Sequence, residues 1–243
     1  MSQSQRWLRI VSILAVTTVA LALRLRAVER LPIDYDEDDY LIVSGGAAVS
    51  AVALGASMAY AFARFRFPGR RAGLFALLVG ALLPPVALMT PLYVLLTALG
   101  LRTTLLGLMI VYTSFSMPFC IWNMRSAFQA VPEELEAAAF LDGASHWVAF
   151  WRVTLPLALP SIGVAALIAF ILGYSEFAIG WLFVETSETV TLAMAISGML
   201  RSGFFSWSRL AALSILMALP VVVLFLVLQR YLLRGLLIGL VED

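Results

Sequence analysis

The fold of this chain is decided by a short polar stretch between long apolar ones, Glu136-Ala137-Ala138-Ala139-Phe140-Leu141-Asp142-Gly143-Ala144. Nine residues separate Gly143 from a second anchor, Val153-Thr154-Leu155-Pro156. Pro132 precedes the stretch, at a helix start, where its missing N–H costs nothing. Asp142-Gly143 supplies the sharp turn that ends the helix. The pattern predicts a capped helix, a turn and a second helix.

The surface of the predicted helix suits contact with another protein. The acids among residues 133–136 lie near the positive end of the helix dipole. The alanines at 137–139 add no bulk, so this face can seat in a groove of a partner. The alternative is an ordinary loop helix that joins two membrane spans.

The composition is that of a membrane protein. Hydrophobic residues make up 62% of 243 and charged residues 13%, with a mean hydropathy of +0.97, far from a typical soluble domain. The net charge of +1 provides no basic face for nucleic acid. All sixteen basic residues are arginine, which excludes a P-loop lysine, so another chain must hydrolyse any ATP used. Cys120 lies in an apolar run and is expected to be an inert buried thiol.

Six apolar stretches approach or reach the roughly 20 residues that a membrane span needs. They are residues 7–23, 41–62, 72–88, 105–122, 162–183 and 210–228. We therefore predict an all-α membrane protein with about six transmembrane helices. The first stretch lacks a small-x-small cleavage site and is expected to be a retained span. Pro84-Pro85 predicts a kink in the third, followed by a helix at the far interface.

The arginines set the predicted orientation. With the N-terminus in the cytoplasm, ten of the sixteen arginines fall inside and six outside, as the positive-inside rule favours. This orientation places the loop of residues 132–156 and both termini in the cytoplasm.

The anchors of the polar loop stand at the intervals of the cytoplasmic EAA loop of ABC-importer permeases. From about residue 42 to 235, the chain resembles the second permease subunit of carbohydrate-type importers, the maltose-transporter-like class. The matching segments are Ala59-Tyr60-Ala61-Phe62-Ala63-Arg64, Phe67-Pro68-Gly69-Arg70, Leu99-Gly100-Leu101 with Thr103-Thr104, Met117-Pro118-Phe119, Val131-Pro132-Glu133-Glu134-Leu135, Asp142-Gly143-Ala144, Leu155-Pro156-Leu157 and Gln229-Arg230.

The resemblance implies a type I importer permease of the inner membrane, with a coupling-helix loop that sits in a cleft of an ATPase. It also implies the partners: a second homologous permease, two ATPase subunits, an extracytoplasmic solute-binding protein that delivers a sugar, and membrane lipid. No catalytic residue, metal site or cofactor is predicted. The predicted ATPase-coupling residues are Glu136, Ala137, Ala138, Ala139, Asp142, Gly143, Leu155 and Pro156.

A second candidate site lies in the fifth apolar stretch. Where the family usually has an aromatic-Asn-acid cluster, this chain reads Tyr174-Ser175-Glu176-Phe177. Glu176 is the only carboxylate deep in a predicted span, which favours a place for Tyr174 and Glu176 in the substrate path. The alternative is a structural carboxyl, protonated or paired with a polar group of the partner permease.

The N-terminal segment departs from the family. We predict three parts: a first span with an acidic loop at 1–40, the permease domain at 41–235 and a cytoplasmic tail at 236–243. The segment's Asp36-Glu37 pair resembles the opening of a membrane glycosyltransferase that uses lipid-linked sugar. The alternative function is therefore a fragment or chimera of such an enzyme, although the rest of its body is missing.

Overall fold

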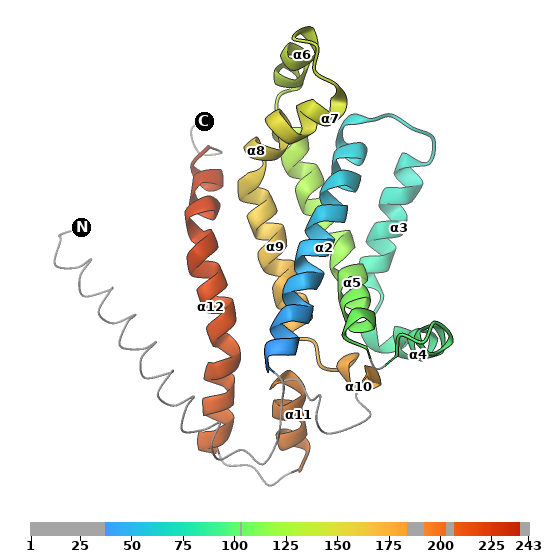
Figure 1. Cartoon of the computed structure of the whole chain (residues 1–243), viewed down its shortest axis with the longest axis vertical. Coiled ribbons are helices and arrows are strands. Elements are labelled where there is room, and N and C mark those ends of the chain that lie inside the picture. Colours follow the sequence, from blue (N-terminus) through green and yellow to red (C-terminus); the bar gives the residue numbers. More distant parts are fainter. Residues whose placement is uncertain (1–36, 103, 184–191, 203–206, 239–243) are drawn as a thin grey trace, which may run out of the picture.

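The computed structural model describes residues 37–102, 104–183, 192–202 and 207–238, in which every regular element is a helix (Figure 1). The elements are α2 (Glu37–Arg64), α3 (Arg70–Leu82), η1 (Pro85–Leu88), α4 (Met89–Ala98), α5 (Leu105–Ala130), α6 (Glu133–Leu141), α7 (His146–Ala149), the π-helical η2 (Phe150–Thr154), α8 (Leu155–Leu157), α9 (Leu159–Tyr174), α10 (Gly180–Phe183), α11 (Leu192–Ser202) and α12 (Trp207–Ile238).

The described residues contain three helices long and apolar enough to cross a membrane, in α2, α5 and α12. Two bent helix pairs, α3 with η1–α4 and α7–α8 with α9, raise the number to as many as five. These positions correspond to five of the six predicted spans. The sixth prediction, 7–23, lies outside the described residues.

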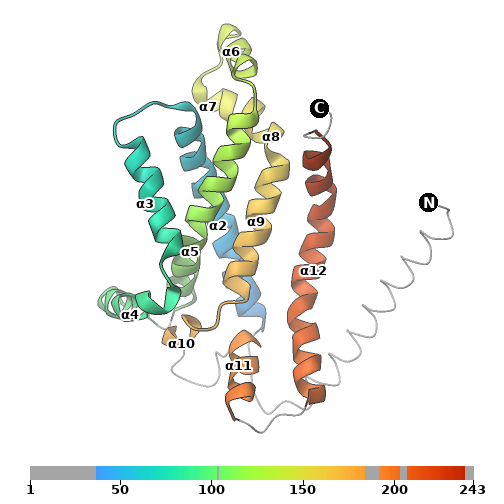
Figure 2. The ribbon, with the colours of Figure 1, turned by 180° about the vertical axis from the view of Figure 1, so that it is seen from behind.

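The core of the bundle forms where α2, α5 and α9 pack side by side (Figures 1 and 2). Small residues let the helices approach closely, as is usual in membrane bundles. A Cβ on Gly55 of α2 would lie 3.3 Å from the Cβ of Cys120 on α5, and Ala165 of α9 is fully buried. Cys120 itself is fully buried and unpaired, as predicted.

The predicted kink in the third apolar stretch is confirmed. Helix α3 ends at Leu82. The next two residues, Leu83 and Pro84, are extended, and Pro85 starts η1. The pair is bent by 101°, because neither proline can donate the backbone hydrogen bond that would continue α3. Helix α4 consequently lies across the end of the bundle opposite α6 (Figure 1).

The predicted span at 162–183 is wrong in its second half. Helix α9 ends at Tyr174, and a turn follows before the short α10. Glu176 stabilises this turn, because its carboxylate accepts hydrogen bonds from the backbone N–H groups of Ala178, Ile179 and Gly180. These bonds give the backbone a local alternative to the helix ladder.

Candidate functional site

The polar loop projects from one end of the bundle, between α5 and α9 (Figure 1). Helix α6 starts directly after Pro132 and ends at Leu141, as the sequence predicts. Ser145 caps α7 by accepting a hydrogen bond from the N–H of Val148. The predicted helix, turn and second helix are therefore confirmed.

The turn after α6 depends on glycine. Gly143 has φ of 86°, in the left-handed region that a side chain disfavours. Its N–H donates to the Phe140 carbonyl at 3.0 Å, and the N–H of Ala144 donates to the Ala139 carbonyl at 2.9 Å. This pair of bonds is a Schellman motif, which satisfies the last carbonyls of α6 and fixes where α7 begins.

The exposed side of the loop lies beside a hollow. Ala137, Ala138, Asp142 and Gly143 are exposed, and Leu141 is 90% exposed. The hollow has a volume of about 410 Å³. It is lined by Ala139, Asp142, Gly143, Ala144, Val148, Ala149, Arg152 and Val153. A side chain of another protein could enter it.

Glu136 points the opposite way from the alanines, into the bundle. It is 4% exposed and is the only buried residue of the nine in α6. Its Oε1 accepts from Arg64 Nε at 2.8 Å and from Thr154 Oγ1 at 2.6 Å, while its Oε2 accepts from Tyr60 Oη at 3.0 Å. One carboxylate therefore joins α2, α6 and η2.

Three of these four residues were missed from the sequence. Tyr60 and Arg64 stand one turn apart at the end of an apolar helix, which is the signal that could have paired them. Thr154 is the one polar residue between the predicted anchors Val153 and Leu155. Of these anchors, Leu155 is partly buried and Pro156 is exposed, both at the start of α8.

Further contacts hold the same end of the bundle. Arg64 Nη2 donates to the carbonyl of Val131 after α5 at 2.7 Å, and Arg125 Nε donates to the Phe62 carbonyl in the last turn of α2 at 3.3 Å. Each arginine thus satisfies a helix-end carbonyl of the neighbouring helix. The Tyr60 ring lies 4.8 Å from that of Phe150.

The environment of Glu136 predicts an acid-sensitive contact. Burial alone would raise the pKa of Glu136, but hydrogen bonds from Thr154, Arg64 and Tyr60, with the charge of Arg64, lower it below its ordinary value. The stabilisation is therefore complete above the unfolded pKa of about 4.3 and is lost as pH falls through the lower folded pKa. Thermal unfolding of the detergent-solubilised protein between pH 7 and 3 should show a larger stability loss in the parent than in Glu136→Gln. Equal losses would contradict this prediction.

The second candidate site lies at the opposite end of the bundle. The sequence predicts Glu176 inside a helical span, but the residue lies in the turn after α9. Its Oε2 accepts from Tyr112 Oη at 3.4 Å, and its carbonyl accepts from Tyr40 Oη at 2.7 Å. Tyr40 and Tyr112 share a hydroxyl contact of 2.9 Å. This cluster joins the start of α2 to α5 and to the end of α9.

The two predicted substrate-path residues lie in different surroundings. Glu176 and Tyr112 line a cavity of about 330 Å³ between α3, α5 and α9. Tyr174 is 2% exposed, with its ring stacked 5.3 Å from that of Phe170 in the bundle interior. The structure therefore brings Glu176, but not Tyr174, to the cavity wall.

We expect Glu176→Gln to destabilise the turn after α9. Both carboxylate oxygens accept backbone N–H bonds, so an amide NH₂ would face at least one donor. An unsatisfied group costs about 1–3 kcal/mol, which thermal unfolding in detergent can measure. Ser175→Ala, one residue away and exposed, is the matched control. Parental stability in Glu176→Gln would refute the capping role.

Comparisons with known proteins agree with this architecture. Residues 51–238 match the family described as binding-protein-dependent transport system inner membrane component. The chain belongs to this family of transport permeases. The permease is 36% identical over 196 residues to the trehalose transport system permease protein SugB of Mycobacterium tuberculosis, which covers 80% of this chain and 72% of SugB. It is 34% identical over 202 residues to the maltose/maltodextrin permease MalG of Escherichia coli, with 81% and 68% covered.

A solved structure supports the fold. One chain of a bacterial ABC transporter involved in the import of the acidic polysaccharide alginate matches with a TM-score of 0.67 and 21% identity. The match covers 95% of the permease and 98% of that chain. The protein is therefore a multi-pass inner-membrane permease of an ABC importer and not an enzyme. Its family implies an ATPase, a binding protein and a partner permease.

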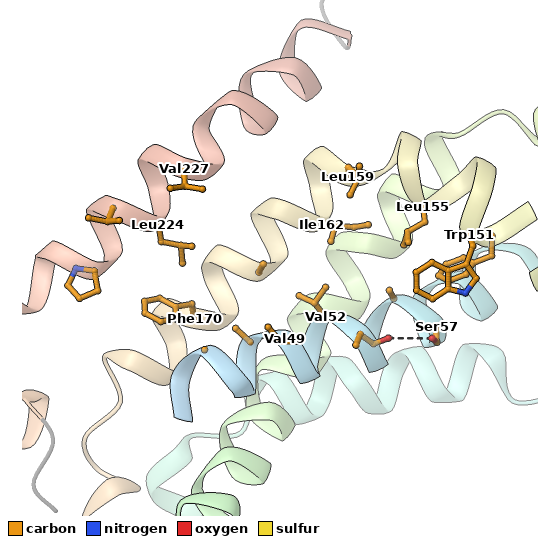
Figure 3. A pocket seen from close by; sticks show the side chains of 18 residues that line it. Val49, Val52, Ser57, Trp151, Leu155, Leu159, Ile162, Phe170, Leu224 and Val227 are labelled. Carbon is orange, nitrogen blue, oxygen red and sulfur yellow. Dashed lines mark hydrogen bonds between the residues drawn. The ribbon is translucent and has the colours of Figure 1, made fainter. Parts of the chain in front are cut away.

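The permease also has an apolar groove of about 740 Å³ between α2, α9 and α12 (Figure 3). Side chains such as Val52, Ile162 and Leu224 face it from the three helices (Figure 3). Its lining includes one hydroxyl, Ser57, which donates to the Ala53 carbonyl at 3.3 Å. A buried sugar would leave its hydroxyls unpaired there, so the groove does not suit a polar solute.

Proposed function

We propose that the permease forms, with a homologous partner permease, the path for a sugar or related small polar solute. Two ATPase subunits drive it, and an extracytoplasmic binding protein delivers the solute. The sugar substrate is supported by the relatives SugB and MalG, described as trehalose and maltose/maltodextrin permeases. In the proposed mechanism, nucleotide-driven closure of the ATPases pushes the loop and rocks the membrane helices between two orientations.

The observation that carries the proposal is the exposed face of α6 beside its glycine turn. Residues 137–139, Asp142 and Gly143 would seat in the ATPase cleft, with the nearby hollow receiving an ATPase side chain. Leu155 and Pro156 would connect that contact to α9 through α8.

The arginines of the described residues support a cytoplasmic position for this end of the bundle. The connection from α2 to α3, the end of α5 and the loop lie together at the end that carries α6 (Figures 1 and 2). The arginines in these segments are Arg64, Arg66, Arg70, Arg71, Arg125 and Arg152.

Purification of the tagged permease from native membranes tests the proposal. We expect an ATPase and a partner permease to co-purify, and a sugar-loaded binding protein to stimulate ATP hydrolysis after reconstitution. Trehalose, maltose and an amino acid should be compared as solutes. Absence of an ATPase from the complex, or stimulation by the amino acid alone, would contradict the proposed function.

We propose that residues 1–40 form an atypical first part without catalytic activity, ahead of the permease domain at 41–235 and the tail at 236–243. The acids of this part form an incomplete set for a lipid-sugar transferase. The double change Asp36→Ala with Glu37→Ala is therefore expected to leave sugar uptake at the parental rate in vesicles. Glycosyl transfer from a polyprenyl-phosphate sugar, abolished by the double change, would contradict it.

A further inference from the structure

One side chain, Glu136, makes the buried part of the attachment of α6 to the rest of the permease. Glu136 is the only residue of α6 that is buried, while the helix's other acids, Glu133 and Glu134, are exposed. A force applied to the outer face of α6 reaches the bundle through Glu136, through the chain at the two ends of the helix, or through two surface contacts, Glu133 with Arg64 at 3.8 Å and Phe140 with His146.

The carboxylate of Glu136 joins one membrane helix to the segment that leads into another. On one side it binds Tyr60 and Arg64, in the last turns of α2. On the other it binds Thr154, the last residue of η2, which continues through α8 into α9. The π-helical turn of η2 places Phe150 and Thr154 on the buried side, and such turns often occur at functional positions.

The partners of Glu136 are themselves fixed. Arg64 also holds the Val131 carbonyl at the end of α5, so its guanidinium is bound on two sides. The Tyr60 ring packs between Phe128 and Phe150, at centroid distances of 6.1 and 4.8 Å. The joint formed by Glu136 with Tyr60, Arg64 and Thr154 therefore has little freedom to rotate.

We propose that Glu136 is a positioning residue that locks the coupling helix to α2 and η2, so that displacement of α6 moves α2 and α9 as one body. This inference rests on the proposed contact between α6 and an ATPase. At the other end of the bundle, the contacts among Tyr40, Tyr112 and Glu176 join the same helices, so the displacement reaches the extracytoplasmic end.

Glu136→Gln tests the joint, because it keeps the shape of the side chain and removes the charge. Glu134→Gln is the matched control: the same change on the same helix, at an exposed position. In the complete reconstituted complex, we expect Glu136→Gln to assemble and hydrolyse ATP. Solute transported per ATP should fall by about fivefold or more, as expected for loss of a coupling interaction. Glu134→Gln should match the parent.

A distance measurement follows the joint directly. Spin labels at Leu141→Cys and Leu54→Cys, both at exposed positions, report the separation of α6 and α2. The native Cys120 is fully buried. We expect a narrow distribution of distances in the parent and in Glu134→Gln, and a broad one in Glu136→Gln. Two results for Glu136→Gln would overturn the proposal. The first is a parental distance distribution with a parental amount of solute transported per ATP. The second is a parental distance distribution with equal losses of ATP hydrolysis and of transport.

Thr154→Val covers the case in which Glu136→Gln does not assemble, since it removes one donor and keeps the Arg64–Glu136 pair. A broadened distribution in Thr154→Val supports the joint, and a parental one overturns it. Failure of the proposed function gives a different result. The ATPase would then be absent from the parent complex, while the label distances would still report the joint.

Discussion

Replacement of Gly143 by valine is expected to lower solute uptake strongly while leaving the permease in the membrane. Gly143 has φ of 86°, and a left-handed backbone costs a residue with a side chain roughly 1–2 kcal/mol. A β-branched side chain adds to this cost. A Cβ at Gly143 would meet nothing within 4 Å, so the effect comes from the backbone and not from a clash.

The backbone of Gly143 controls the position of the proposed contact. Relaxation of φ would break the bonds to Phe140 and Ala139 that end α6, and the hollow beside the turn would change shape. We expect uptake in vesicles to fall by about tenfold or more, since each 1.4 kcal/mol of lost contact is a factor of ten. Permease abundance should remain parental because the turn is exposed.

The control for this prediction is Gly143→Asn. Asparagine tolerates the left-handed region better than other residues with a side chain. Gly143→Asn should therefore retain most of the uptake. Parental uptake in Gly143→Val would show that the loop is not the coupling element. Loss in Gly143→Asn with activity in Gly143→Val would show that side-chain polarity, and not the backbone, matters at this turn.

Replacement of Arg64 by methionine is expected to have the largest effect on stability. The side chains of Arg64 and Glu136 are 8% and 6% exposed. Removal of one partner of such a buried pair leaves the other charge uncompensated, at a cost of about 3–5 kcal/mol. The Val131 carbonyl would lose its donor as well. Thermal unfolding in detergent should therefore show a marked decrease in melting temperature, with reduced assembly.

Arg66→Met is the matched control, because Arg66 is an exposed arginine two residues away. We expect parental stability in this variant. The double variant Arg64→Met with Glu136→Leu removes both charges and should recover part of the loss. Parental stability in Arg64→Met would contradict the buried pair, and losses in Arg64→Met and Glu136→Leu that simply add in the double variant would show that the two charges are not coupled.

The parts predicted from the sequence depend on local signals. Gly143 and the end of α6 could be predicted because a turn glycine and its helix lie within a few residues of one another. The kink at Pro84-Pro85 follows from the chemistry of proline alone. Long apolar stretches likewise indicated α2, α5 and α12, because apolar length and composition are properties of a single segment.

The parts that could not be predicted depend on distant partners. Glu136 stands beside two exposed acids of the same helix, and its partner Arg64 lies 72 residues away. The inward direction of Glu136 is therefore a result of tertiary packing. The apolar neighbours of Glu176 predict a place inside a span. In the structure its carboxylate instead accepts hydrogen bonds from the backbone N–H groups of Ala178 and Ile179, which follow it in the chain. Hydropathy does not detect such a local hydrogen-bonded turn.

A cysteine-to-lysine cross-link at Ala138→Cys would capture the proposed contact between the α6 face and an ATPase. The chain contains no lysine, so adducts to its own lysine side chains cannot form. Val94→Cys, at an exposed position on α4 at the other end of the bundle, is the control. In the purified complex, we expect an ATPase adduct from Ala138→Cys that changes with nucleotide, and none from Val94→Cys. No ATPase adduct from Ala138→Cys, or an equal yield from Val94→Cys, would contradict the account.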